Sequence, residues 1–363
     1  MEKIKLIVLL IIISVIYGCT PENPKPDPIP VSNTDAIGAY VLCEGIFNMN
    51  NSTLVYYDFK SGIVSDDLFL EVNNRGLGDT GNDLKQYGSK LYCVVNISSQ
   101  IEVMDVNSVR SIKQISLANR QPRYIAFFED KAYVSCYDGS VLKLDTTTLE
   151  IEDIATAGCN PEGLCVANGK LYVANSGGLN YPNYGNTVSV FDLTTFTKIK
   201  DITVGVNPYS IKSDFQGDVY LVSRGNYGNI PYSFQRIDSQ IDEVVQNFDI
   251  EVLNFTISGN YAYLYNYDYS SQTSWIKVMD ITTEATVKDN LISDGTDIDI
   301  PYGIAVNPVN GDIYIADAND FVSNGDVFCF DKNGNKKFSF EVGLNPNSLV
   351  IRLKNQAKLL SFN

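Results

Sequence analysis

An internal repeat is the feature of this sequence that most constrains its fold. A short apolar segment centred on tyrosine, such as KLYVANSG, recurs seven times at spacings of 39 to 52 residues. A second apolar run that ends in aspartate, such as VFDLTT, follows each one, so the two kinds of segment alternate strictly. The tyrosines are Tyr40, Tyr92, Tyr133, Tyr172, Tyr220, Tyr263 and Tyr314, and the aspartates are Asp58, Asp105, Asp145, Asp192, Asp238, Asp280 and Asp331.

The repeat unit predicts four short strands. Aspartate followed by Thr, Ser, Asn or Gly is typical of a turn, because its carboxylate accepts hydrogen bonds from backbone amides two residues on. A further apolar run opened by proline, as in NPEGLCVA and IPYGIAVN, precedes most tyrosine segments. Four strands at this period are the signature of a β-propeller blade. The sequence therefore predicts an all-β, seven-bladed propeller; the alternative, an irregular β-sandwich, does not explain the matched landmarks.

The two ends of the repeat region predict how the ring closes. The first unit begins at its second strand, whereas the C-terminal NPNSLVIRL resembles an unmatched first strand. We expect residues 349–353 to pair with the strand that contains Tyr40, because this pairing removes two free sheet edges. One propeller domain then accounts for residues 37–363.

The segment before the repeats has the layout of a secretory signal. Lys3 and Lys5 precede an apolar run over residues 6–16, which is too short to span a bilayer. The Gly18-Cys19 junction that follows resembles the lipobox of bacterial lipoproteins. We expect a signal peptide over residues 1–18 and lipid attachment at Cys19; the alternative is an ordinary signal peptide with a chance cysteine. Residues 19–36 are rich in proline, which predicts an extended tether.

Charge and composition exclude several classes of function. The formal net charge is −16, which argues against binding nucleic acid, because phosphates require clustered Lys and Arg. It disfavours an anionic membrane surface for the same reason. The chain contains no histidine, so a histidine base, a Ser-His-Asp triad and an imidazole metal site are all excluded.

The loops between the second and third strands carry the candidate binding residues. The tetrapeptide NYGN occurs in two such loops, around Tyr184 and Tyr227, in neighbouring blades four and five. We expect these tyrosines to rise side by side from one face. Aromatic, amide and arginine side chains on loops over a rigid scaffold are typical of a recognition surface; the alternative is solvated loops with some aromatic packing. The predicted ligand-binding residues are Phe47, Arg123, Asn183, Tyr184, Arg224, Asn226, Tyr227, Tyr267, Trp275 and Phe321.

Two further groups of residues bear on chemistry. Carboxylates and amides follow five of the landmark tyrosines by three or four residues, and such oxygen ligands suit Ca²⁺; ordinary turn chemistry explains them equally. They are Glu44, Asn96, Asn175, Asn266 and Asp317. We expect no bound metal and no catalytic residues. The six cysteines after Cys19 lack the spacing of a disulfide framework, and Cys159 with Cys165 is the only local pair.

The repeats also carry a family resemblance. The segments VNPVNGDIYIADANDFVSNGDVFCFDKNGN and LGDTGNDLKQYGSKLYCVVNISSQIEVMDVNS, with the lipobox ahead of them, resemble the YncE-like seven-bladed propeller lipoproteins of Bacteroides-type bacteria. Within that family they are most similar to the cobalamin-capturing BtuG type. The resemblance covers about residues 37–353, and no single motif carries over an individual cobalamin contact.

The resemblance implies a function. It implies a palmitate-anchored lipoprotein on the cell surface, at the outer membrane, that captures cobalamin or a related corrinoid. The corrinoid would be a transported ligand and not a cofactor, passed to a TonB-dependent transporter of the BtuB type. The alternatives are a surface propeller that binds a glycan or a protein, a structural lipoprotein, and a metal-dependent hydrolase of the lactonase type.

Overall fold

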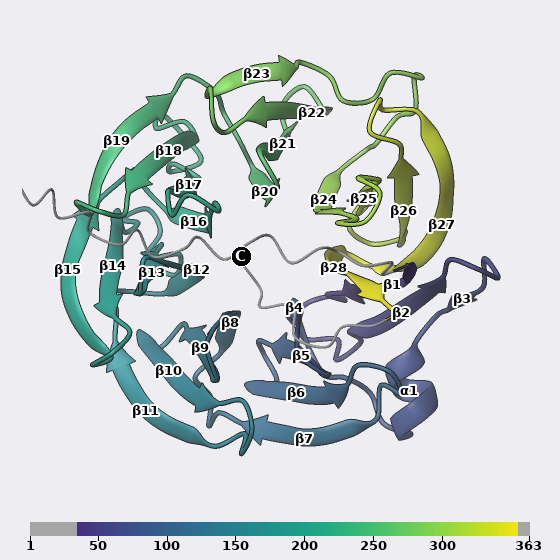
Figure 1. Ribbon diagram of the computed structural model, residues 1–363, viewed down its shortest axis with the longest axis horizontal. Helices are drawn as coiled ribbons and strands as arrows, with labels where there is room; N and C mark the ends of the chain where they lie inside the picture. The colour runs from purple at the N-terminus through teal and green to yellow at the C-terminus, as the bar shows by residue number, and fades with distance from the viewer. Residues whose placement is uncertain (1–34, 355–363) are drawn as a thin grey trace, which may run out of the picture. The chain divides into compact units, whose positions relative to one another are not determined.

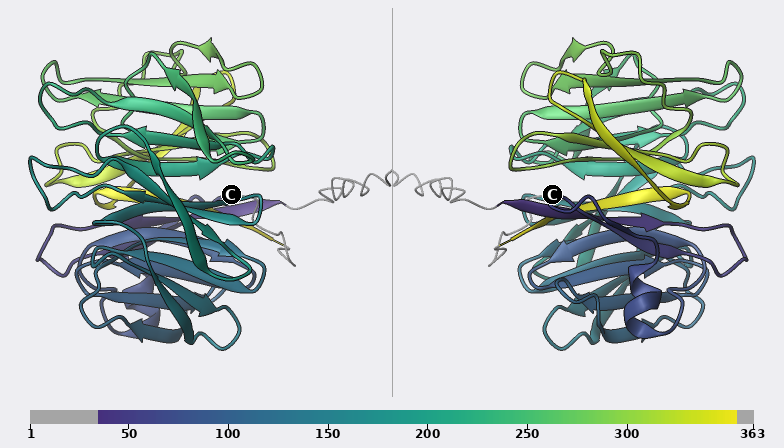
Figure 2. Two further views of the ribbon diagram at one scale, coloured as in Figure 1. Left: turned by 90° about the vertical axis from the view of Figure 1, so that its left-hand side faces the viewer. Right: turned by 90° about the vertical axis from the view of Figure 1, so that its right-hand side faces the viewer.

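The protein is a seven-bladed β-propeller, as the repeat predicts. The computed structural model describes residues 35–354, in which seven four-stranded antiparallel sheets form a ring (Figure 1). The signal peptide, Cys19 and the tether lie outside the described residues. Seen edge-on, the strands of each blade run between the two faces of the ring (Figure 2).

Each blade runs from the ring axis outward in the order of its strands. Blade one is β28 (Pro346–Leu353), β1 (Ala36–Cys43), β2 (Thr53–Asp58) and β3 (Val64–Ser65). Blades two and three are β4 (Gly81–Tyr87), β5 (Lys90–Val95), β6 (Gln100–Asp105), β7 (Ser111–Ser116), then β8 (Pro122–Phe128), β9 (Lys131–Cys136), β10 (Ser140–Asp145), β11 (Ile151–Thr156). Blades four and five are β12 (Pro161–Ala167), β13 (Lys170–Asn175), β14 (Thr187–Asp192), β15 (Thr197–Thr203), then β16 (Pro208–Ser213), β17 (Val219–Ser223), β18 (Ser233–Asp238), β19 (Glu243–Phe248). Blades six and seven are β20 (Asn254–Ser258), β21 (Tyr261–Asp268), β22 (Thr273–Asp280), β23 (Ala285–Lys288), then β24 (Pro301–Val306), β25 (Ile313–Asp317), β26 (Asn324–Phe330), β27 (Lys336–Leu344).

Helical structure is minor in the described chain. Between β3 and β4 lies α1 (Leu68–Asn73), capped by the Asp67 carboxylate, which accepts a hydrogen bond from the Leu70 amide. Asn74 ends it in the left-handed conformation, with φ 53°. Over residues 35–354, no helix has both the length and the apolar character needed to cross a membrane.

Both ends of the described chain build blade one. In the pairing of β28 with β1, Val350 lies opposite Tyr40, and Leu353 lies opposite Ala36. This confirms the predicted closure. Because Ala36 begins β1 and Leu353 ends β28, both ends lie on the same face of the ring, where the Lys354 amide donates to the Asp35 carbonyl over 3.0 Å.

The landmark tyrosines bind neighbouring blades together. Six of the seven are buried, and a buried hydroxyl needs a hydrogen-bond partner. Tyr40 of blade one donates to the Val106 carbonyl of blade two over 2.7 Å, and Tyr220 of blade five donates to the Ile281 carbonyl of blade six over 3.3 Å. In blade six the landmark Tyr263 is only half-buried, and Tyr265 is the fully buried ring.

The landmark aspartates close the turns that follow the third strands. The Asp145 carboxylate accepts from the amides of Thr147 and Thr148 over 2.8 and 2.7 Å, and Asp280 does the same for Thr282 and Thr283 over 2.8 and 3.1 Å. This is the turn chemistry that the sequence predicts.

The hydrophobic core is divided into seven layers, each between two neighbouring blades. One layer joins Tyr92 and Val94 of blade two to Val134 and Leu142 of blade three, and six similar clusters fill the other interfaces. The inner strands are therefore fixed on both sides, and they provide a rigid base for side chains at the axis.

Candidate functional site

One face of the ring carries the long loops, and we call it the loop face. It consists of the loops between second and third strands together with the crossovers between blades. Backbone hydrogen bonds join the two kinds of segment: the Gly177 amide donates to the Cys159 carbonyl and the Gly225 amide to the Val206 carbonyl, both over 2.9 Å. The start of β1 at Ala36 and the end of β28 at Leu353 lie on the opposite face.

A ring of side chains surrounds the axis just below the loop face. In six blades the pairing of the inner strand shifts register directly after its first residue. Such a bulge re-aims the side chain that follows. The inner strands are the innermost elements in Figure 1. We call the residues in second place on six of these strands the axial ring, namely Asn82, Arg123, Glu162, Tyr209, Tyr302 and Asn347.

One half of the axial ring is a closed ion-pair network around Arg123. Its Nε donates to Glu162 Oε2 over 2.8 Å, and its Nη1 donates to the Asn82 side-chain oxygen. The other Glu162 oxygen accepts a hydrogen bond from the Tyr137 hydroxyl. The centroid of the Tyr137 ring lies 4.6 Å from the guanidinium carbon of Arg123. The side chains of Arg123 and Glu162 are only 12% and 5% exposed. Burial alone would lower the pKa of Arg123, but the Glu162 carboxylate and the tyrosines raise it well above its usual value.

Arg224, on the other half, has no such partner. It follows the last residue of β17, and its guanidinium carbon lies 3.3 Å from the centroid of the Tyr209 ring. The Tyr209 hydroxyl in turn accepts from the Tyr124 hydroxyl over 2.6 Å. Within residues 35–354, the buried Nε of Arg224 has no hydrogen-bond partner.

Glu44 lies on the same side of the axis as Arg224 and Tyr302. It enters from the loop between β1 and β2, and its Oε2 accepts from the Tyr302 hydroxyl over 2.8 Å. Burial raises the pKa of Glu44, while the hydrogen bond from Tyr302 and the charges of Arg123 and Arg224 act in the opposite direction.

The two NYGN tyrosines lie side by side, as predicted. The ring centroids of Tyr184 and Tyr227 are 5.9 Å apart, at an interplanar angle of 80°. Tyr181 extends the row at one end, 6.1 Å from Tyr184, and Tyr232 extends it at the other, 6.4 Å from Tyr227. We call these four residues the tyrosine line. Edge-to-face contacts of this kind favour a defined arrangement of the rings.

The remaining predicted loop residues divide into presented and structural side chains. Phe47 and Asn183 are exposed on the loop face. Phe321 packs edge-on against Tyr302, with centroids 5.7 Å apart. The Asn226 side chain accepts from the amides of Gly228 and Ile230 over 3.0 and 2.9 Å, so it holds its own loop in shape.

The expectation that Tyr267 and Trp275 lie in a loop is wrong. The Asp268 carboxylate accepts from the Ser270 amide over 2.7 Å and closes a tight hairpin, so both residues fall within β21 and β22. Tyr267 is only 8% exposed, in the core between blades six and seven, and Trp275 packs against the core between blades five and six. The exposed aromatic residue of this hairpin is Tyr269, whose centroid lies 4.8 Å from that of Tyr267.

Five members of the axial ring are absent from the predicted ligand-binding residues, namely Asn82, Glu162, Tyr209, Tyr302 and Asn347. A signal for four of them exists, since all but Asn82 directly follow the proline that opens the inner strand, in NPE, NPY, IPY and NPN. The same position gives Arg123 in QPR. The residue after the opening proline of an inner strand therefore identifies five of the six members of the axial ring.

The carboxylates and amides after the landmark tyrosines fasten strand ends to crossovers. Asn96 donates to the Pro122 carbonyl over 3.0 Å, and Asp317 accepts from the amides of Asp299 and Ile300, both over 2.8 Å. Asn175 donates to the Ser189 hydroxyl over 2.9 Å, whereas the buried side-chain oxygen of Asn266 has no partner among residues 35–354. In the described part of the chain, no three Cys, Asp or Glu side chains group closely enough to hold a metal ion.

The six described cysteines are all free thiols. Cys159 is exposed and Cys165 is buried, so the local pair singled out in the sequence forms no disulfide.

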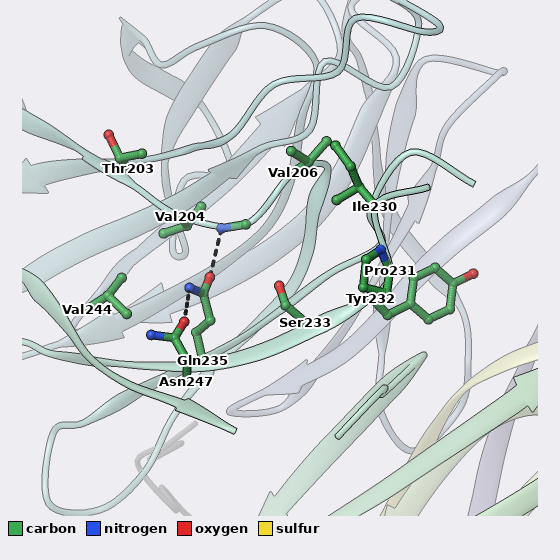
Figure 3. A pocket seen from close by; sticks show the side chains of 11 residues that line it. Thr203, Val204, Val206, Ile230, Pro231, Tyr232, Ser233, Gln235, Val244 and Asn247 are labelled. Carbon is green, nitrogen blue, oxygen red and sulfur yellow. Dashed lines mark hydrogen bonds between the residues drawn. The ribbon is translucent and has the colours of Figure 1, made fainter. Parts of the chain in front are cut away.

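A shallow hollow of about 540 Å³ adjoins one end of the tyrosine line (Figure 3). It lies between the crossover from blade four to blade five and the end of the loop that carries Tyr232. Gln235 crosses its floor, accepting from the Gly205 amide over 2.8 Å and donating to the Asn247 side chain over 2.6 Å. Gln235 therefore bonds to two other groups that line the hollow, and Tyr232 connects the hollow to the tyrosine line.

Fold and site together define a seven-bladed propeller with a polar axial ring and an aromatic line on its loop face. The chain belongs to the family characterised by a domain of unknown function (DUF5074), which matches residues 37–345. No curated protein matches it.

Two solved structures are similar in fold. Hydrazine synthase of Kuenenia stuttgartiensis is 17% identical, with a TM-score of 0.62, over 74% of this chain and 88% of that one. A quinonprotein alcohol dehydrogenase-like protein from Bacteroides thetaiotaomicron is 13% identical, with a TM-score of 0.66, over 88% of this chain and 79% of that one. Identities this low establish a shared propeller and nothing about activity.

Proposed function

We propose that this protein is an outer-membrane surface lipoprotein that captures cobalamin or a related corrinoid and passes it unchanged to a TonB-dependent transporter of the BtuB type. The observation that carries the proposal is the tyrosine line, which places Tyr184 and Tyr227 5.9 Å apart on the loop face. The resemblance of the repeats to the BtuG type names the ligand and the partner.

The chemistry of the loop face suits such a ligand. A corrinoid is broad, apolar on its two faces and fringed with amides. Tyr181, Tyr227 and Tyr269 are 74%, 59% and 59% exposed, and large aromatic side chains left on a surface mark interaction sites. Their rings offer apolar contact, while their hydroxyls and the exposed Asn183 offer hydrogen bonds to amides.

The position of the chain ends is compatible with a lipid anchor. Asp35 and Lys354 meet on the face opposite the loop face, so the described chain begins on the side of the ring away from the tyrosine line. We expect labelled palmitate to be incorporated into the full-length protein and lost in Cys19→Ala. Palmitate that persists in this variant would exclude Cys19 as the attachment site.

The decisive experiment is calorimetric titration of residues 20–363 with cyanocobalamin. Truncating an aromatic anchor at a well-packed interface costs about 2 kcal/mol or more, so Tyr184→Ala with Tyr227→Ala should weaken binding at least about thirtyfold. Tyr261→Ala is the matched control, since Tyr261 is a half-exposed tyrosine at the start of β21, on the opposite face. Binding should survive EDTA, because the proposed contacts use no metal of the protein.

The possible outcomes test the identity of the ligand and the position of the binding site separately. No heat from any corrinoid with the wild type would refute the ligand. Binding that the double variant leaves unchanged would refute the site.

The exposure of Tyr181 and Tyr269 favours one second candidate, a surface propeller that binds a glycan, because aromatic rings stack on the apolar faces of sugars. Heat on titration with oligosaccharides, and none with corrinoids, would replace the first proposal by this one.

A further inference from the structure

Arg224 differs from the other arginines of the loop face. Arg75, Arg120 and Arg123 each pair with a carboxylate, at 2.9, 2.6 and 2.8 Å. Within the described chain the Arg224 side chain forms no ion pair, and its buried Nε lacks any partner. A partly buried guanidinium without an acceptor is unfavourable, so this position is incomplete without a group from elsewhere.

The stacking of Arg224 leaves its two Nη nitrogens available, because within residues 35–354 they form no hydrogen bond and, unlike Nε, they are not buried. With the guanidinium carbon 3.3 Å from the Tyr209 centroid, the ring covers one face of the cation. The N–H donors of arginine lie in the guanidinium plane and point away from a ring stacked beneath it. In-plane pairs of donors match the two oxygens of a carboxylate or a phosphate.

The nearby carboxylates do not meet this need. Glu162 is held by Arg123 and the Tyr137 hydroxyl. Glu44 accepts a hydrogen bond from Tyr302 and, within residues 35–354, forms no ion pair with Arg224.

Two lysines lie deeper along the axis. In all seven blades one inner-strand residue pairs with the landmark tyrosine, and these residues form one layer: Lys85, Ala126, Cys165, Lys212, Thr256, Ala305 and Val350. This layer lies three residues beyond the axial ring, about 10 Å along the strands. Lys85 and Lys212 are its only charged members, and within residues 35–354 neither forms an ion pair. Burial and the charge of Lys85 lower the pKa of Lys212 to about 8, against the opposing effect of Asp83.

Near the axis the four cations Lys85, Arg123, Lys212 and Arg224 outnumber the three carboxylates Glu44, Asp83 and Glu162, in a chain whose net charge is −16. A cationic centre within an acidic surface focuses anions at one place and repels them elsewhere.

We propose that Arg224 binds an anionic group of the ligand, a phosphate or a carboxylate, through its in-plane donors, and that Lys85 and Lys212 help to draw this group to the axis. The inference rests on the proposed function for the place where the ligand lies, and it narrows the ligand to molecules that carry such a group. A corrinoid supplies one if it retains the phosphodiester of its nucleotide loop.

The test compares two corrinoids and one simple anion. Cyanocobalamin carries the phosphodiester and dicyanocobinamide lacks it. Both are titrated into the wild type, Arg224→Gln and Arg120→Gln; the last is a matched control that removes a cation from the loop face away from Tyr209. Inorganic phosphate is titrated separately in a phosphate-free, low-salt buffer, with the ³¹P line width as the readout.

We expect Arg224→Gln to weaken the binding of cyanocobalamin roughly tenfold or more, as for loss of a hydrogen bond to a charged group. The same substitution should weaken the binding of dicyanocobinamide much less. The ³¹P line of phosphate should broaden in the presence of the wild type and of Arg120→Gln, and should stay narrow in the presence of Arg224→Gln. If phosphate binds in this pattern and no corrinoid binds, the anion site stands and the corrinoid proposal fails. Equal weakening of both corrinoids, or phosphate binding that ignores the Arg224 substitution, would overturn the inference.

Discussion

The propeller axis holds two arginines in opposite ways, Arg123 within the axial ring and Arg224 beside it. Arg123 is enclosed by Glu162, Asn82 and the Tyr137 ring. Arg224 stacks on Tyr209 and leaves its donors without acceptors from the described chain. The difference teaches that a carboxylate of a neighbouring blade makes one buried cation at the propeller axis part of the framework, whereas the other keeps the free donors on which the proposed anion site rests. Each substitution below tests that contrast.

The largest effect should come from removing the strand that closes the ring. Asn347 donates to the Gly81 carbonyl over 2.8 Å and belongs to β28, which also pairs with β1. Deleting residues 347–363 leaves the ladder groups of β1 unpaired and removes support from the Arg123 half. We expect aggregation or a much lower melting temperature by circular dichroism. An unchanged melting temperature would contradict the closure.

Next in size is Arg123→Met. It leaves the Glu162 carboxylate buried without its cation, which costs about 3 kcal/mol in the free energy of unfolding. Arg123→Met with Glu162→Met should recover most of this loss, because the uncompensated charge is gone. Urea unfolding of the two variants measures both effects. A single variant as stable as the wild type would show that the network is not structural.

Glu44→Gln should change how stability depends on pH. Because burial raises the folded-state pKa of Glu44, its contribution to stability is present below the unfolded value of about 4.3 and is lost as the pH rises through the folded value. The wild type should therefore lose stability relative to Glu44→Gln as the pH increases from about 4. Parallel curves of unfolding free energy against pH would refute this, and Glu71→Gln on the exposed side of α1 is the control.

The smallest effect on stability should come from Arg224→Met. No carboxylate of the described chain depends on Arg224, so the free energy of unfolding should change by only about 0.5 kcal/mol. Methionine can still pack against Tyr209. If Arg224→Met lowers the free energy of unfolding as much as Arg123→Met in the same urea titration, both arginines are structural and the proposed difference between them is wrong.

Much of the fold was predictable, because its signals are local. The Asp145 and Asp280 turns form within three residues, and the alternation of tyrosine and aspartate segments reflects strands of fixed length. The adjacency of Tyr184 and Tyr227 followed from equal loop positions in neighbouring blades. Tyr267 and Trp275 were misplaced because the length of a hairpin depends on where its turn closes, here at Asp268, and polar residues such as Ser270 are common in strands and loops alike.

The sequence by itself determined the number of blades, their closure by both chain ends and the face that carries the aromatic loops, since these depend on periodicity and on turns within a few residues. Only the tertiary structure decided which arginine is compensated. Arg123 meets Asn82 and Glu162 across 41 and 39 residues of chain, and Arg224 meets Tyr209 from a different strand of its own blade. Such contacts depend on how far each bulge turns a side chain toward the axis, a geometry set by the packing of neighbouring blades and by no single stretch of sequence.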